Sequence, residues 1–135
     1  MNPDPDLLRA IPLFADLPDE QLETIAGWLE VREESEGRRL VPEGASGYDF
    51  FVIAKGTADV VHGGSVIASL GRGDFFGEMA MMGDEHRRVA DVVATSPITV
   101  YEMFGTNFRQ LEMGMPEIAD QIRGTVEERR KALGA

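Results

Sequence analysis

The residues best suited to chemistry lie between positions 77 and 90, where a Gly-Glu pair is followed by two adjacent arginines. Gly77 lets the backbone come close to a ligand because glycine has no side chain. The amides after it would point outward at a helix start, where anions bind. Arg87 and Arg88 follow, and a guanidinium offers planar paired donors to a phosphate. The pattern favours an anion site.

Glu78 narrows the class of ligand. A carboxylate beside an anion is unfavourable unless it has a partner of its own, and a ribose hydroxyl can donate a hydrogen bond to it. Amides and arginine for phosphate, with glutamate for sugar, describe a nucleotide that carries one compact phosphate. A polyphosphate site would need a Walker loop, and the sequence has none. The alternatives are that Glu78 caps a turn and that the two arginines are simply solvated.

Three regions must position these residues. The first forty residues favour helix, with Leu22, Ile25, Ala26 and Leu29 at helical spacing. From Arg38 to Met103, short β-rich runs are broken by glycines, and Gly63-Gly64 predicts a hairpin turn. The expected strands contain residues 50–53, 59–61, 66–68, 90–93 and 98–101.

The end of the chain favours helix again. A short helix is expected over residues 106–113, Gly114 breaks it, and Pro116 opens another. In this last helix one face carries Ile118, Ile122, Val126, Arg129 and Leu133.

The predicted fold class is therefore α+β. We expect an antiparallel, jelly-roll-like β-roll flanked by N-terminal helices and a C-terminal pair of lid helices. The expected organisation is a single domain over residues 1–135, with helices in 1–30, the β-roll in 31–104 and the C-terminal helices in 105–133.

These segments together resemble the cyclic nucleotide-binding domain family, over nearly the whole chain. Residues 77–80, Gly-Glu-Met-Ala, followed by Arg88-Val89-Ala90, are similar to the phosphate-binding cassette of that family. Residues 11–14, 43–47 and 50–53 resemble the segments before the pocket. The tail from Pro116 to Arg130 is most similar to bacterial cyclic nucleotide-gated potassium channels.

The resemblance implies a role for each cassette residue. Glu78 would hold the ribose 2′-hydroxyl, and Arg88 would neutralise the cyclic phosphate, with Arg87 as the alternative. The register favours Arg88 because Arg88-x-Ala90-x-Val92 matches the family's run into the next strand. The backbone amides that help cradle phosphate or sugar would be those of Gly77, Met79 and Ala80.

Two further residues refine the expected ligand. Many relatives carry Ser or Thr at the position of Val89, and that hydroxyl is associated with holding cGMP. Its absence favours cAMP over cGMP. Arg129 lies in a Glu-Arg-Arg run similar to that of the channels, where an arginine contacts the ligand from the lid. Stacking on adenine is one expectation for Arg129, and a snorkelling side chain near the helix end is the other.

Composition excludes several other functions. The formal net charge of −11 argues against nucleic-acid binding, and no run of eighteen apolar residues is present to insert into a membrane. The chain has no cysteine and only two histidines, so we expect no metal site and no cofactor beyond the ligand. The acidic, Pro-rich start is unlike a signal peptide, and a cytoplasmic location is expected.

The sequence thus predicts a non-enzymatic regulatory sensor that binds cAMP, with cGMP as the second ligand, and relays occupancy by closing its last helix. An effector protein or channel would be its partner. The alternatives are a ligand-free β-roll interaction module and a cupin-like enzyme, and the second of these lacks the cluster of metal ligands it would need. A transcription regulator would need a helix-turn-helix after the long helix, and the acidity of the chain argues against DNA.

Overall fold

The computed structural model describes residues 1–41, 50–76 and 91–132. Its helices are α1 (Pro5–Leu8), α2 (Asp19–Trp28), α4 (Gly105–Gly114) and α5 (Pro116–Ala132). Its strands are β1 (Leu29–Glu34), β2 (Arg39–Val41), β3 (Phe50–Lys55), β4 (Ala58–His62), β5 (Ser65–Leu70), β6 (Phe75–Phe76), β7 (Asp91–Ala94) and β8 (Ile98–Met103).

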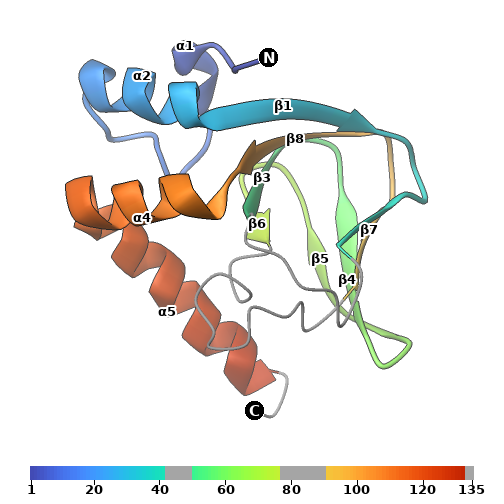
Figure 1. The fold of residues 1–135 in the computed structure, drawn as a ribbon. Coiled ribbons are helices and arrows are strands. Elements are labelled where there is room, and N and C mark those ends of the chain that lie inside the picture. Colours follow the sequence, from blue (N-terminus) through green and yellow to red (C-terminus); the bar gives the residue numbers. More distant parts are fainter. Residues whose placement is uncertain (42–49, 77–90, 133–135) are drawn as a thin grey trace.

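The strands form two antiparallel sheets. The first has the order β1-β8-β3-β6 and the second the order β2-β7-β4-β5. Both mix strands that are far apart in sequence, as expected for a jelly-roll-like arrangement. The helices gather at the side of the first sheet, and β4 and β5 lie at the opposite side of the molecule (Figure 1). The predicted α+β fold with an antiparallel β-roll is confirmed.

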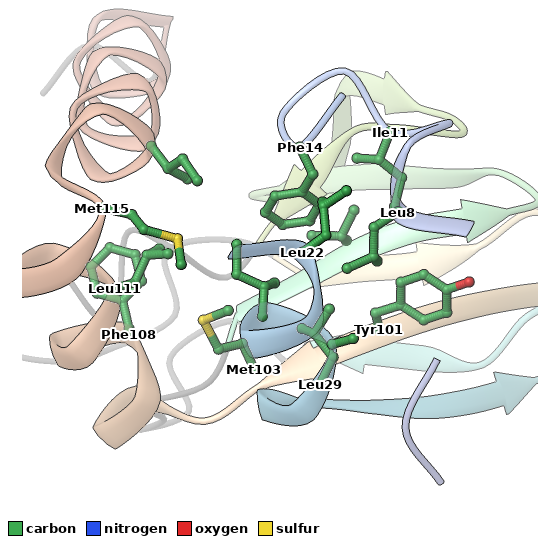
Figure 2. Close-up of a cluster of buried hydrophobic side chains, with 14 of the residues drawn as sticks. Leu8, Ile11, Phe14, Leu22, Leu29, Tyr101, Met103, Phe108, Leu111 and Met115 are labelled. Carbon is green, nitrogen blue, oxygen red and sulfur yellow. The ribbon is translucent and has the colours of Figure 1, made fainter. Parts of the chain in front are cut away.

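One face of the first sheet packs against the helices. Strand residues of this face, such as Val52, Tyr101 and Met103, share a buried cluster with side chains from all four helices or their flanking turns. Figure 2 shows Leu8, Phe14 and Leu22 converging on this cluster, with Phe108 and Met115 approaching from the C-terminal side. The helical segments at the two ends of the chain are therefore joined through one core.

The opposite face of the first sheet packs against the second sheet. Phe51, Ile53 and Phe76 from the first sheet are buried together with Val92 and Ala94 from the second. In the first sheet, residues alternate between the two clusters: Val52 lies in the helix-facing cluster and its neighbours Phe51 and Ile53 in the inner one.

The turns explain part of the glycine pattern. Gly63 and Gly64 connect β4 to β5 with φ angles of 59° and 81°, which confirms the predicted hairpin turn. Two positive φ angles in succession are typical of a type I′ turn, which matches the twist of the strands it joins.

The start of the chain contains more strand than the sequence indicated. The first forty residues favoured helix, but residues 29–34 form β1, which pairs with β8 from Leu29↔Met103 to Glu34↔Ile98. β2 pairs with β7. Pairing to distant strands outweighs the helical preference of the glutamates here. The expected roll boundary at residue 31 therefore falls two residues inside β1.

The lengths and composition of the described helices show whether any of them could span a membrane. Within residues 1–41, 50–76 and 91–132, no helix has the length and apolar character needed to cross a bilayer.

Candidate functional site

Most of the predicted ligand residues lie outside the described residues. This applies to Gly77, Glu78, Met79, Ala80, Arg87, Arg88 and Val89. Their assignments stay predictions. The structure does describe the strands that lead into residues 77–90 and out of them.

The strand that leads into this stretch is anchored by an aromatic pair. β6 ends at Phe76, directly before Gly77, and pairs with β3 through Phe51↔Phe76 and Val52↔Phe75. The Phe51 and Phe76 rings stack with their centroids 5.0 Å apart and an angle of 18° between their planes. Both side chains are buried. The backbone that leads to Gly77 is therefore held from the inner face of the first sheet.

The strand that leaves this stretch belongs to the other sheet. β7 begins at Asp91 and lies between β2 and β4. The Asp91 carboxylate lies 3.9 Å from the Arg39 guanidinium of β2. Residues 77–90 thus join an edge strand of one sheet to an inner strand of the other. A segment with this connection is anchored at both ends by β-structure.

A charged group lies on the inner face of the first sheet. The Arg32 guanidinium is 3.3 Å from Glu34 and 3.4 Å from Glu102, and its central carbon lies 5.6 Å from the centroid of the Phe51 ring. Arg38 adds a second cation 3.5 Å from Glu34. These arginines neutralise the carboxylates of Glu34 and Glu102, whose side chains are only 18% and 13% exposed. This cluster was not predicted, because apolar and charged residues alternate only over residues 29–32 and Glu33 and Glu34 break the pattern.

The predicted lid face is only partly described. Ile118 and Ile122 of α5 are buried in the helix-facing cluster. Arg129 lies within α5, but its side chain, like that of Val126, lies outside the description, and so does the whole of Leu133. Arg123 bonds to Asp120 on its own helix at 2.8 Å and to Glu112 on α4. The base of α5 is thus fixed to α4 by apolar packing and by an ion pair.

The remaining chemistry among the described residues is sparse. Within residues 1–41, 50–76 and 91–132, no three His, Cys, Asp or Glu side chains come together in a way that could hold a metal ion. Burial raises the pKa of the Tyr101 hydroxyl above its ordinary value, and the nearby positive charge of Arg72 partly offsets this. Tyr101 faces the helices, on the side of the sheet opposite to Phe51.

Comparison with known proteins supports the predicted family. Residues 31–113 match the family model "Cyclic nucleotide-binding domain", a span that includes the whole of residues 77–90. A cGMP-dependent protein kinase of Drosophila melanogaster is 33% identical over 93% of this chain and 14% of its own length. A cyclic nucleotide-gated potassium channel of Rhizobium etli is 34% identical over 92% of this chain and 34% of its own length. The chain therefore spans only a minor part of these relatives.

Solved structures show the same fold. The cAMP-bound structure of PfPKA-R is 26% identical and matches with a TM-score of 0.87 over 96% of this chain and 45% of that one. The regulatory subunit of a cAMP-independent protein kinase A from Trypanosoma brucei is 25% identical, with a TM-score of 0.80 over 90% of this chain and 45% of that one. With its two antiparallel sheets, its terminal helices and the match over residues 31–113, this chain belongs to the cyclic nucleotide-binding domain family.

Proposed function

We propose that this chain is a regulatory sensor domain that binds one cyclic nucleotide, preferring cAMP. Glu78 would accept a hydrogen bond from the ribose 2′-hydroxyl, and Arg88 would pair with the cyclic phosphate. The amides of Gly77, Met79 and Ala80 would complete the cradle. The observation that carries the proposal is the family match over residues 31–113, a span that contains Glu78 and, ten residues later, Arg88.

The proposed relay uses the last helix. A ligand can shift an equilibrium only by its difference in affinity between two states. A lid that contacts the base in its closed state provides such a difference, and Arg129 is the proposed contact. Residues 1–135 would act as one domain, because the helices at both ends share a core with the sheet. We propose that the domain has no catalytic activity of its own and that it lies in the cytoplasm.

The output partner is proposed from the relatives. Those named above are a kinase and a potassium channel, and the chain covers 14% and 34% of their lengths. An effector protein or a channel would therefore receive the signal, either in the same polypeptide or as a separate chain.

A thermal-shift series tests the proposal. Ligand at about one hundred times its Kd stabilises the folded state by about 2.7 kcal/mol, which raises Tm by several degrees in a domain of this size. We expect cAMP to raise Tm at lower concentrations than cGMP, and linear 5′-AMP to have no effect. A rise with 5′-AMP equal to that with cAMP would contradict recognition of a cyclic phosphate.

Selectivity has its own test at Val89. One hydrogen bond contributes about 0.5–1.5 kcal/mol. Val89→Thr should therefore reduce the ratio of the cGMP Kd to the cAMP Kd by about two- to twelvefold. Val89→Ala is the control, because it changes the size of the side chain without adding a hydroxyl. Equal affinities of the parent chain for both nucleotides would refute the preference for cAMP.

A ligand-free interaction module is the second candidate. The regulatory subunit of a cAMP-independent protein kinase A from Trypanosoma brucei has the same fold, so this fold also occurs in a kinase that does not depend on cAMP. If cAMP, cGMP and 5′-AMP all leave Tm unchanged at millimolar concentration, this second function is favoured.

A further inference from the structure

One row of paired residues crosses the first sheet from edge to edge. Glu30 of β1 pairs with Glu102 of β8, Glu102 with Phe51 of β3, and Phe51 with Phe76 of β6. Paired residues of an antiparallel sheet point to the same face. This row therefore connects β1 to the residue directly before Gly77 along the inner face of the roll.

Two side chains contact the Phe51 ring, one from this row and one from β1 two residues further along the strand. Phe76 stacks on it at 5.0 Å, and Arg32 lies 5.6 Å from its centroid. β6 and β1 form opposite edges of the sheet, so the two contacts reach the ring from opposite directions. The guanidinium is in turn held by Glu34 and Glu102.

Both phenylalanine side chains of this stack are buried. Phe51 is 4% exposed and Phe76 is 1% exposed. Closely packed interiors transmit displacements, because there is no free volume in which a side chain can adjust. The described residues of β6, Phe75 and Phe76, are held by their pairing with β3 and by the phenylalanine stack.

We infer that Phe51 is a positioning residue for the ligand site: its ring, held by Arg32, fixes Phe76 and thereby the backbone that enters Gly77 and Glu78. The inference rests on the proposed function for its ligand readout. Phe51 need not touch the nucleotide, because it acts through the covalent continuity of Phe76 with Gly77. Its expected effect is on affinity, in addition to any effect on stability.

The test compares Phe51→Leu with Ile98→Val. Ile98 belongs to the same buried cluster, but it lies four residues along β8 from Glu102, the register partner of Phe51, a separation of about 13 Å. Two readouts are taken: the cAMP Kd by calorimetry, at a temperature where all variants are folded, and the NMR shifts of the 77–80 amides without ligand. Arg32→Lys is the third variant, because it keeps the charge but loses the flat guanidinium.

We expect Phe51→Leu to weaken cAMP binding by about two- to twelvefold and to shift the 77–80 amides. Arg32→Lys should act in the same direction by about two- to fivefold. Ile98→Val should lower Tm but leave affinity and these shifts unchanged. If Phe51→Leu does not fold, Arg32→Lys decides by the same two readouts.

If the parent chain binds cAMP and Phe51→Leu binds it with the same affinity, the inference is overturned. It is also overturned if Ile98→Val loses as much cAMP affinity as Phe51→Leu. A parent that binds no cyclic nucleotide contradicts the proposed function instead. In that case the amide shifts of Arg32→Lys decide the positioning role, because they are measured without ligand and that variant keeps the Phe51 ring, whose loss would by itself shift nearby amides.

Discussion

Gly56 lies so close to Pro97 that a Cβ atom at residue 56 would come within 2.5 Å of the Pro97 carbonyl oxygen. Gly56 is in the turn between β3 and β4, and Pro97 is in the turn between β7 and β8. The φ angle of Gly56 is 97°, which other residues rarely adopt. This contact joins two neighbouring turns at the same end of the roll, where β3 leads into β4 and β7 into β8.

Replacing Gly56 with alanine should therefore be costly in two ways. The backbone conformation costs about 1–2 kcal/mol for a residue with a side chain, and the clash adds about 1–3 kcal/mol, giving about 2–5 kcal/mol in total. Gly64→Ala is the matched control, because Gly64 also has a positive φ but has open space around its Cβ position. Urea unfolding measures both variants. Equal losses of stability in Gly56→Ala and Gly64→Ala would show that the close approach to Pro97 adds nothing to the cost of the substitution.

Tyr101 predicts a pH dependence of stability. Burial raises the pKa of its hydroxyl above 10.0 in the folded state, and Arg72 partly offsets this. The unfolded chain therefore loses this proton first as the pH rises. The contribution to stability is complete below about pH 10 and is lost as the pH rises through the folded-state pKa. Tyr101→Phe should lose less stability than the parent as the pH rises above about 10 in denaturant unfolding. Parallel stability curves for the two proteins would contradict this.

The centre of the fold could be predicted because its signals are local. Apolar runs such as residues 50–53 and 98–101 lie within β3 and β8, and Gly63-Gly64 marked the hairpin between β4 and β5. β1 was missed because Leu-Glu-Val-Arg-Glu-Glu has the composition of a helix, and only pairing with β8 makes it a strand. Local preference carries no information about a partner seventy residues away.

The candidate ligand residues could be predicted from a motif, but the contacts within the sheet that lead to them could not. Glu78 and Arg88 belong to a short pattern that a sequence displays directly. The contacts of Arg32 with Phe51 and of Phe51 with Phe76 join residues that are 19 and 25 positions apart. Such contacts depend on strand order and register, which the pattern of apolar residues does not specify.

The choice between Arg88 and Arg87 is tested by affinity. Removing a charged partner from a buried contact costs about 2–5 kcal/mol, so Arg88→Ala should weaken cAMP binding by about thirtyfold to several thousandfold. Arg87→Ala should cost much less, because we expect that side chain to be solvated. If Arg87→Ala is the more damaging change, the register of the cassette is wrong by one residue.

The lid is tested by shortening the chain. A chain ending at residue 128 keeps the buried Ile118 and Ile122 and should remain folded. It loses the proposed stacking of Arg129, worth about 0.5–2 kcal/mol, so cAMP affinity should fall by about two- to thirtyfold. A chain ending at Lys131 retains Arg129 and is the control. Unchanged affinity in the shorter chain would mean that the end of α5 does not act as the lid.

Calorimetric titration of the parent chain with cAMP is the most direct test of cyclic-nucleotide binding, because it reports heat, affinity and stoichiometry together. We expect saturable heat with one site per chain, tighter binding than for cGMP, and loss of that heat in Arg88→Ala. No heat with either nucleotide at millimolar concentration, in a chain that circular dichroism shows to be folded, would contradict it.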